Sequence, residues 1–344
     1  MLYPQQNAAR LCAEQDGVWD FCLSHDLQGA DIDPAAPLPG ARPMAVPGSY
    51  NDQGEDKALR DHYGWAFYQK QLTLPALCAG QRVVLRFGAV THKARVWLDG
   101  RLIAEHTGGF LPFEADITGR MQPGDTARLT VACDNRVDHS TLPVGNEPGQ
   151  IAFFGSDNAG IPSVEHGKAS AAPQNRPNFD FFNYAGIHRP VWLYTTPRDF
   201  IRDITLVPHN DGRLDYSVET AGQGTVTLTV LDPDGAPVAR GEGARGTLTV
   251  PQPRLWEPWP GTPALYTVEV CFGADRYRQT FGFRQIRVEG ARVLLNGKPL
   301  YFKGCSKHED SAFHGRGLDP CLNVKDAGLL HWLGANAGRT SHYP

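Results

Sequence analysis

The sequence has 344 residues, enough for two or three domains, and its 41% hydrophobic and 20% charged content is typical of a globular protein. A formal net charge of −4 provides no basic field for nucleic acid or an anionic membrane surface. No apolar run approaches the roughly 18 residues of a membrane span. We therefore expect neither nucleic acid nor a membrane among the partners.

The seven cysteines are odd in number, scattered along the chain and never spaced as CxxC. This distribution is typical of reduced thiols rather than of a disulfide framework or a zinc site. The residues after Met1 contain no basic stretch followed by an apolar core, so no signal peptide is predicted. Together these features lead us to expect a cytoplasmic protein.

Short strands separated by turns are predicted through the first part of the chain. Apolar and polar residues alternate in residues 82–87, 93–98 and 127–131, and Asp99-Gly100 is a hairpin turn signal. Many such strands without a helical stripe favour a sandwich or jelly roll. Residues 138–177 are rich in Pro, Gly, Asn and Ser, and a connection of roughly forty residues is predicted to be a functional or partly mobile loop.

A second β module is predicted after an aromatic-rich segment. Residues 179–194 are predicted to form a strand pair, and Thr195-Thr196-Pro197 marks a boundary. The strands predicted beyond it include residues 204–207, 225–230 and 266–270. A module of this size and strand spacing matches an immunoglobulin-like sandwich, although it has no Cys–Trp–Cys pattern.

The pattern changes after residue 290. Asn296-Gly297 predicts a hairpin turn, and residues 300–304 predict a short buried strand. Asp319-Pro320 predicts an N-cap and first turn of a helix that ends near Gly334. The helix is expected to present one apolar face, made of Leu322, Leu329, Leu330 and Leu333.

A polar strand follows this helix, so the order is strand, helix, strand, as at the start of a (β/α)₈ barrel. Functional groups of such barrels collect at the C-terminal ends of the strands. The two predicted strand ends carry His308-Glu309-Asp310 and residues 339–343 (RTSHY). This density of hydrogen-bonding groups indicates a site rather than packing alone.

The motifs of the chain resemble glycoside hydrolase family 2 and, within it, the bacterial β-glucuronidases. The segments that carry the resemblance are 46–53 (VPGSYNDQ), 108–113 (GGFLPF), 181–194 (FFNYAGIHRPVWLY), 302–310 (FKGCSKHED) and 336–344 (NAGRTSHYP). The last segment is similar to the family signature N-x-x-R-[ST]-[SA]-H-Y-P. The resemblance covers nearly the whole chain, in the family's order.

The resemblance implies a mostly β chain in three parts: a jelly-roll sugar-binding domain (1–197), an immunoglobulin-like sandwich (198–287) and the first strands and helix of a TIM barrel (288–344). It also implies a retaining enzyme that hydrolyses terminal β-D-glucuronides, a small-molecule substrate, and that needs no cofactor and no metal. The full-length protein is expected to be a homo-oligomer, a dimer or tetramer.

The resemblance places the catalytic groups outside the given sequence. The family's two catalytic Glu residues and its Asn-x-Lys motif lie on later barrel strands, which would come beyond Pro344. No residue of the chain is therefore assigned as acid/base or nucleophile. We expect the 344-residue chain alone to be inactive.

The resemblance also suggests substrate-binding residues. Asp180 matches an Asp that reaches into the barrel pocket and bonds a sugar hydroxyl, with a turn or cap carboxylate as the alternative. His342 matches a His that lines the sugar subsite, with a buried structural His as the alternative. Arg339 would orient the nucleophile carboxylate or form a supporting ion pair. His308 and Glu309 belong either to the site wall or to the scaffold.

Three other patterns are interpreted as unrelated to catalysis. Asn146-Glu147 mimics the family's Asn-Glu acid/base motif but follows no predicted barrel strand. His308, Glu309, Asp310 and His314 do not have the ligand spacing of a zinc site. Trp256 and Trp259 are expected at a packed sandwich edge rather than stacked on sugar rings.

Two alternative functions stay open at this point. One is a β-galactosidase, mannosidase or other exo-glycosidase of the same family, since fold alone does not fix specificity. The other is a non-catalytic carbohydrate-binding fragment. A barrel with only two strands would expose apolar faces and an open edge, which argues against a stable stand-alone module.

Overall fold

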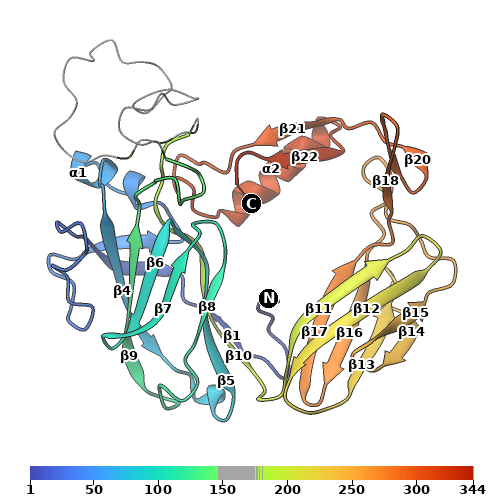
Figure 1. The fold of residues 1–344 in the computed structure, drawn as a ribbon, viewed down its shortest axis with the longest axis horizontal. Coiled ribbons are helices and arrows are strands. Elements are labelled where there is room, and N and C mark those ends of the chain that lie inside the picture. Colours follow the sequence, from blue (N-terminus) through green and yellow to red (C-terminus); the bar gives the residue numbers. More distant parts are fainter. Residues whose placement is uncertain (146–174, 176, 178, 180, 344) are drawn as a thin grey trace.

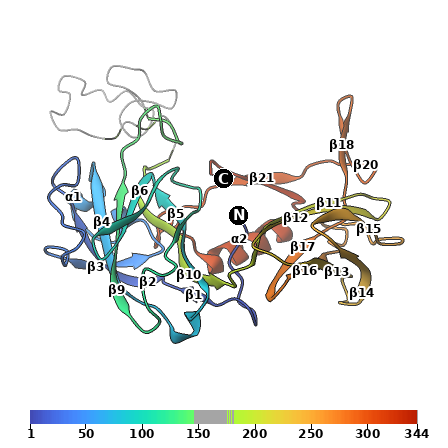
Figure 2. The same ribbon diagram turned by 60° about the horizontal axis from the view of Figure 1, so that its bottom comes forward.

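The computed structural model describes all residues except 146–174, 176, 178, 180 and 344. Two β modules lie side by side, and the segment after residue 285 runs from the second module back to the first (Figure 1). A second view keeps this arrangement, with helix α2 (Pro320–Trp332) between the two modules (Figure 2). Among the described residues, no helix is long and apolar enough to cross a membrane.

The first β module is a sandwich of two antiparallel sheets. One sheet has the order β1-β10-β5-β8 and consists of β1 (Cys12–Glu14), β5 (Arg82–Thr91), β8 (Phe113–Asp116) and β10 (Gly186–Thr196). The other has the order β3-β2-β4-β9-β6-β7 and consists of β2 (Gly17–Leu23), β3 (Arg42–Val46), β4 (Trp65–Thr73), β6 (Lys93–Leu98), β7 (Arg101–Thr107) and β9 (Thr126–Asp134). The connections carry the short helices η1 (Tyr50–Asp52), α1 (Lys57–Arg60) and η2 (Ala76–Cys78).

The core of this module lies between the two sheets, because alternate residues of each strand face inward. Trp19, Phe21, Tyr68 and Phe87 are among its fully buried side chains. The predicted hairpin is confirmed: Asp99 and Gly100 both have positive φ between the paired strands β6 and β7.

The second β module is a smaller sandwich. One sheet has the order β11-β12-β15, made of β11 (Phe200–Pro208), β12 (Arg213–Ala221) and β15 (Arg245–Thr249). The other has the order β14-β13-β16-β17, made of β13 (Val226–Leu231), β14 (Pro237–Glu242), β16 (Tyr266–Phe272) and β17 (Asp275–Phe281). Their inner faces enclose a separate core that includes Leu214, Val268 and Phe283.

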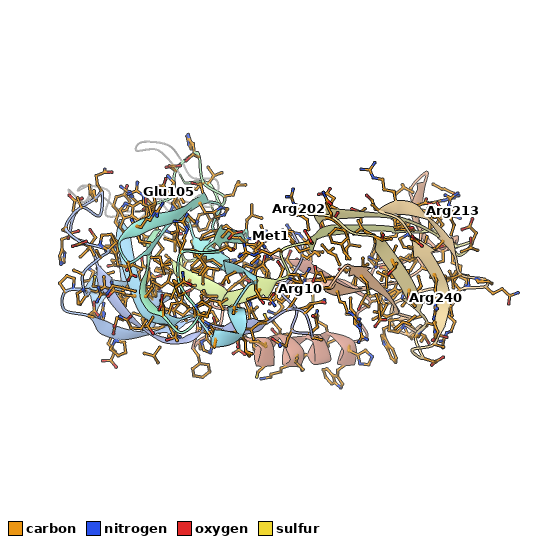
Figure 3. All side chains as sticks on the ribbon, turned by 90° about the horizontal axis from the view of Figure 1, so that it is seen from below. Met1, Arg10, Glu105, Arg202, Arg213 and Arg240 are labelled. Atoms are coloured by element: carbon orange, nitrogen blue, oxygen red, sulfur yellow. The ribbon has the colours of Figure 1, made fainter. Side chains whose placement is uncertain are left out.

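The N-terminal segment joins the two modules. Arg10 donates from Nε and Nη2 to the two carboxylate oxygens of Asp275, at 2.7 and 2.6 Å, and both side chains are buried. The same carboxylate accepts the amide of Ile201 at the start of the second module. Met1 and Arg10 lie at the junction of the modules in Figure 3. Paired in this way, the buried charges attach the segment just before β1 to the second module.

The C-terminal segment (residues 286–343) contains two small sheets and helix α2. One sheet is antiparallel and consists of β18 (Ile286–Glu289), β19 (Arg292–Leu295) and β20 (Lys298–Pro299). The other is a parallel pair, β21 (Gly304–Lys307) and β22 (Ala337–Thr340). The Asp319 side chain caps α2 by accepting from the Leu322 amide at 3.0 Å, and Gly334 ends it at φ +76.

The predicted fold class is therefore confirmed, but two local predictions are wrong. The described residues of the range 179–194 contain one strand, β10, rather than a pair. The strand predicted at 300–304 begins at Gly304, and Tyr301 and Phe302 before it are exposed. Helix α2 buries none of its residues: on the predicted leucine face Leu322 and Leu330 are half-buried, whereas Leu329 and Leu333 are exposed. The predicted domain boundaries stay predictions.

Candidate functional site

The ends of β21 and β22 lie next to each other, because the two strands are parallel and in register from Gly304 and Ala337 onward. The pairing continues one step further, where the Ser341 amide donates to the Lys307 carbonyl at 2.9 Å. The residues that follow each strand therefore meet at one edge. Helix α2 connects the two strands, so a strand–helix–strand unit forms as predicted.

Two imidazoles and a hydroxyl meet at this edge. The rings of His308 and His342 are 5.6 Å apart and perpendicular. The Ser341 hydroxyl lies 3.5 Å from Nε2 of His308 and 3.2 Å from Nε2 of His342. Arg339 approaches Nδ1 of His342 through Nη2 at 3.3 Å. These groups offer several donors and acceptors to a hydroxylated ligand.

The next group at the edge is a buried arginine, Arg316, from the loop between β21 and α2. Its Nε lies 3.2 Å from Oδ1 of Asp310 and 3.6 Å from Oε1 of Glu309. Its guanidinium carbon lies 4.1 Å from the ring centre of Phe181 and 5.0 Å from that of Phe110. Both aromatic rings belong to the first module, so the loop is in contact with that module.

The backbone of this loop is also bound to the first module. The Ser49 amide donates to the His314 carbonyl at 3.0 Å, and the Leu318 amide donates to the His188 carbonyl at 2.7 Å. Gly315 and Gly317 permit the close approach: an added Cβ would lie 2.6 Å from Ser49 Cβ and 2.6 Å from Gly48 Cα, respectively. Only glycine fits at these two positions without moving the backbone.

Buried histidines of the first module support this contact. His188 lies between Ser49 Oγ, at 3.1 Å from Nε2, and Thr91 Oγ1, at 2.9 Å from Nδ1. His92 contacts the Asn183 amide oxygen through Nε2 at 2.7 Å. Burial lowers the pKa of His92 to about 4 and the pKa of His188 well below its usual value, so both rings are neutral at pH 7.

Burial also shifts the pKa values of two titratable groups at the strand ends, Glu309 and Tyr343. Burial raises the pKa of Glu309, and the positive charges of Arg316, Arg189 and Lys307 oppose this rise. Burial raises the pKa of the Tyr343 hydroxyl as well. Perturbed pKa values of this kind are characteristic of functional sites, although structural ion pairs also produce them.

Four of the predicted site residues lie together. His308, Glu309, Arg339 and His342 are brought to one place at the strand ends. Arg339 contacts an imidazole there, and the structure shows no bidentate carboxylate partner for it among the described residues. The functional roles of these four residues stay predictions.

Several positions named in the sequence analysis lie outside the described residues. They are Asp180, the Asn146-Glu147 pair, Pro344 and most of the loop predicted at residues 138–177. The substrate contact of Asp180 and the coincidental nature of Asn146-Glu147 therefore stay predictions. The same holds for the two catalytic Glu residues, because they are expected beyond Pro344.

Arg316 and the aromatic rings around it were not predicted from the sequence. A signal was present: Gly315-Arg316-Gly317 places one large charged residue between two glycines in the first βα loop. Glycines that allow a close approach are expected where two backbones meet. The second partner of that contact, residues 48–49, lies about 270 positions away in sequence, a separation that local patterns do not bridge.

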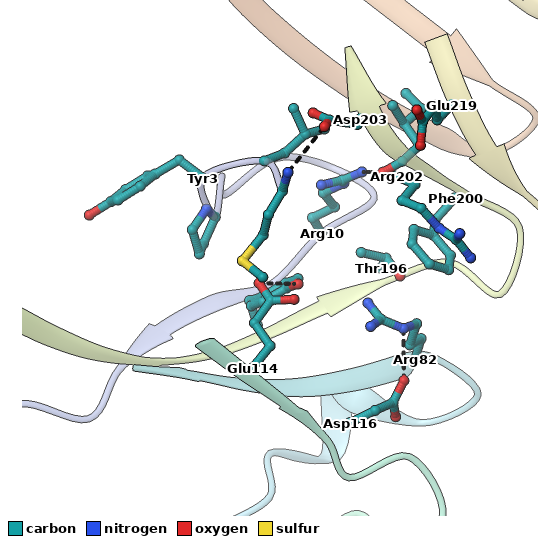
Figure 4. A pocket seen from close by; sticks show the side chains of 15 residues that line it. Tyr3, Arg10, Arg82, Glu114, Asp116, Thr196, Phe200, Arg202, Asp203 and Glu219 are labelled. Atoms are coloured by element: carbon teal, nitrogen blue, oxygen red, sulfur yellow. Dashed lines mark hydrogen bonds and ion pairs between the residues drawn. The ribbon is translucent and has the colours of Figure 1, made fainter. Parts of the chain in front are cut away.

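A separate cleft of about 580 Å³ lies between the two modules (Figure 4). Its charged side chains largely pair with one another: Arg82 donates to Asp116 at 2.9 Å, and the Met1 amine lies 3.1 Å from Asp203. None of the predicted site residues lines it. We therefore regard the cleft as part of the module junction rather than as the chemical site.

Trp256 and Trp259, predicted at a sandwich edge, lie in the loop between β15 and β16. Trp256 carries the Arg284 guanidinium at 4.8 Å from its ring centre, and Trp259 contacts the His331 ring of α2 at 4.3 Å. Protein groups therefore lie against both indoles. Among the described residues, no group of three or more His, Cys, Asp or Glu side chains is arranged to hold a metal ion.

The arrangement at the strand ends is suited to binding and orienting a hydroxylated ring. Retaining glycoside hydrolysis needs two carboxyl groups about 5–5.5 Å apart, one as nucleophile and one as acid/base. Glu309 and Asp310 both lie close to one buried cation, Arg316, which favours a structural or binding role for them.

Comparison with known proteins matches all three parts of the chain. Sequence profiles of glycosyl hydrolases family 2 match residues 13–197 (sugar binding domain), 200–284 and 286–344 (TIM barrel domain). A protein from Paenibacillus borealis named beta-glucuronidase is 42% identical over 355 residues, which cover 100% of this chain and 57% of that protein.

Solved structures give the same result. The Faecalibacterium prausnitzii beta-glucuronidase is 66% identical with a TM-score of 0.95, over 100% of this chain and 58% of that one. The Bifidobacterium dentium beta-glucuronidase complexed with coumarin-3-O-glucuronide is 47% identical with a TM-score of 0.92, over 100% and 59%. This chain thus spans little more than half the length of these relatives. Because the sugar-binding, sandwich and barrel parts all match in order, the chain belongs to glycosyl hydrolase family 2.

Proposed function

We propose that this protein is a retaining β-glucuronidase that hydrolyses terminal β-D-glucuronides. The observation that carries the proposal is the identity of 40–66%, over the whole chain, to proteins named beta-glucuronidase. The ligand named for the Bifidobacterium dentium structure is a glucuronide, which supports a small glucuronide as the substrate.

In this proposal the described residues bind the sugar rather than cleave it. His308, Ser341 and His342 would donate and accept hydrogen bonds at sugar hydroxyls, and Arg339 would hold the His342 ring. The nucleophile and the acid/base would be Glu residues on later barrel strands, so the 344-residue chain alone would be inactive. Asp180 would join the subsite from the first module.

Two further features belong to the proposal. We propose a cytoplasmic location, supported by seven scattered cysteines, all of which are free thiols in the structure. We also propose that the full-length protein is a homo-oligomer, as the family resemblance suggests.

The test is an assay of the whole gene product with 4-nitrophenyl β-D-glucuronide, and with the corresponding galactoside and mannoside. We expect hydrolysis of the glucuronide. His342→Ala should lower kcat/KM by roughly 10- to 100-fold, the effect of losing one or two sugar hydrogen bonds. His331→Ala, which removes an exposed imidazole on α2, is the matched control and should leave kcat/KM unchanged.

Two outcomes would contradict the proposal in different ways. Hydrolysis of the galactoside or mannoside but not the glucuronide would place the protein elsewhere in the same family. A carbohydrate-binding role without catalysis would instead appear as glycan binding by the whole gene product with no hydrolysis of any of the three substrates.

A further inference from the structure

Arg316 is buried at the point where the first module meets the ends of β21 and β22. Only 1% of its side chain is exposed. Phe181 and Phe110 lie against the guanidinium, and the Tyr343 ring centre is 5.9 Å away. An arginine so deeply buried is costly unless its charge is balanced and its donors are used.

The charge of Arg316 is balanced by carboxylates of its own loop. Asp310 and Glu309 approach Nε at 3.2 and 3.6 Å. However, Nε and Nη2 form no hydrogen bond within the described part of the chain, and Oδ1 of Asp310 is also without one. The guanidinium therefore holds the two carboxylates mainly by charge, and two of its nitrogens are buried without a hydrogen bond.

The backbone of Arg316 is held independently of these carboxylates. Its amide donates to Ser49 Oγ at 2.9 Å, and Ser49 Oγ also contacts Nε2 of the buried His188 at 3.1 Å. The side chain and the backbone of one residue thus connect the core of the first module to the strand ends of the barrel segment. Because the first module fixes the backbone, the position of the guanidinium is set by that module.

We infer that Arg316 is a positioning residue, which the first module holds in place so that it fixes Glu309 and Asp310 as one wall of the sugar subsite. The inference rests on the proposed glucuronidase function. It assigns the sugar-binding module a direct part in building the subsite: Ser49, His188, Phe110 and Phe181 hold Arg316, and Arg316 holds the carboxylates.

Arginine is specifically suited to this role. Its guanidinium carbon lies 4.1 and 5.0 Å from the ring centres of Phe181 and Phe110 while its Nε approaches the carboxylates. A lysine ammonium has no planar group with which to make both kinds of contact. If the position served packing alone, a well-packed apolar residue would be at least as stable as a buried ion pair. Lysine at position 316 should therefore keep the charge but lose part of the geometry.

The pKa of Glu309 should depend on the Arg316 cation, and this dependence distinguishes a positioning role from packing alone. The charged groups that face Glu309 are Arg316, Arg189 and Lys307, which stabilise its anion, and Asp310, which opposes it. Removing the Arg316 cation while Glu309 stays buried would raise the pKa of Glu309 further. Glu309 would then become neutral at a higher pH than in the wild type.

The experiment compares Arg316→Gln, Arg316→Lys and wild type in the whole gene product, with kcat and KM for 4-nitrophenyl β-D-glucuronide measured between pH 4.5 and 8. We expect R316Q to raise KM at least tenfold, with a smaller change in kcat, and to move the acidic limb of kcat/KM to higher pH. R316K should keep the limb in place but raise KM. Arg254→Gln, which removes an exposed pair with Asp234 in the second module, is the control and should change neither.

Hydrogen exchange of the same variants gives a second measurement that does not need activity. R316Q should speed exchange in residues 308–318 and leave β5 unchanged. If the wild type hydrolyses no glucuronide, the proposed function fails, and the exchange result alone decides whether Arg316 holds the loop. If R316Q has unchanged KM, acidic limb and exchange, the inference is overturned. If R316Q does not fold, R316K and Phe181→Leu provide the same comparison.

Discussion

The first module and the C-terminal segment differ in where their apolar side chains lie. In the first module the two sheets bury a continuous core that includes Trp19, Phe21 and Phe87. Within residues 286–343, all of which the structure describes, Leu295 is the one buried hydrophobic side chain. Phe313 and Trp332 in the same segment are exposed by about four-fifths, at 82% and 79%.

The other buried residues of the C-terminal segment are two glycines and two polar residues. Gly315, Arg316, Gly317 and Ser341 are buried, and the first three lie against residues of the first module. The difference teaches that the first module stabilises itself, whereas the strand ends of the segment are ordered by a neighbour. Substitutions can distinguish stabilisation by a module's own core from stabilisation by contact with a neighbouring module.

The first pair of substitutions removes one ring from each region. Phe87 is fully buried and its ring stacks on Phe113 at 4.9 Å between centres, so Phe87→Ala should destabilise the first module by about 3–5 kcal/mol. Trp332→Ala, at an exposed position of α2, should change the stability of the 344-residue chain by less than about 0.5 kcal/mol. Hydrogen exchange in β5 and in α2 measures the two effects separately.

Trp332→Ala also tests whether α2 is uncovered in the 344-residue chain. If later barrel elements cover α2 in the whole gene product, the same substitution should cost more there than in the 344-residue chain. An equal and large cost in both chains would mean that α2 is already packed in the shorter chain, which the exposed side chains contradict.

The second prediction concerns pH, because the first module holds its contact to the segment with neutral histidines. Burial lowers the pKa of His92 to about 4, against about 6.5 in an unfolded chain. Because its pKa is lower in the folded protein, the His92 imidazole binds a proton more readily in the unfolded chain. Its contribution to stability is therefore fully present above pH 6.5 and is lost as the pH falls toward 4, by about 3 kcal/mol. His188 acts in the same direction.

Asp16 acts in the opposite direction over the same range. Burial raises the pKa of its carboxyl to about 6, so its protonation on acidification favours the folded state. The pH dependence of wild-type stability is thus the difference between the effects of the histidines and of Asp16. The substitution His92→Gln isolates the effect of His92, because Gln has no titratable group but can still donate to the Asn183 oxygen. Urea unfolding at pH 7 and pH 4.5 should show a smaller loss of stability in H92Q. An identical loss would rule out His92 as the cause.

The sequence predicted the elements whose signals are local. Asn296-Gly297 and Asp99-Gly100 are hairpin turns with positive φ, and Asp319 caps α2, because each feature depends on neighbours a few residues away. The fold class followed from the same strand and turn patterns. The family motifs then brought His308, Glu309, Arg339 and His342 into one group, and these residues lie together in the structure.

The missed features depend on distant contacts. The strand predicted at 300–304 assumed that apolar Tyr301 and Phe302 would be buried, yet an apolar residue is buried only if a partner surface covers it. Arg316 was missed because its partners Ser49, Phe110 and Phe181 come from three distant stretches of the first module. No periodic pattern specifies such a contact, since it arises from how finished modules pack.

The third prediction places a single methyl group at two positions of the C-terminal segment, one against the first module and one in open space. In Gly317→Ala the new Cβ would meet backbone atoms of residue 48 at 2.6 and 2.9 Å, which cannot move without shifting the first module, so the loop contact should weaken by about 1–3 kcal/mol. In Gly328→Ala, inside α2, the new Cβ meets nothing within 4 Å, and the gain in helix propensity should stabilise α2 by about 0.5–1 kcal/mol. Hydrogen exchange should therefore become faster in residues 308–318 for G317A and slower in α2 for G328A. Slower or unchanged exchange of residues 308–318 in G317A would show that the first module does not hold this loop, since the two nearest atoms that the new Cβ would meet belong to that module.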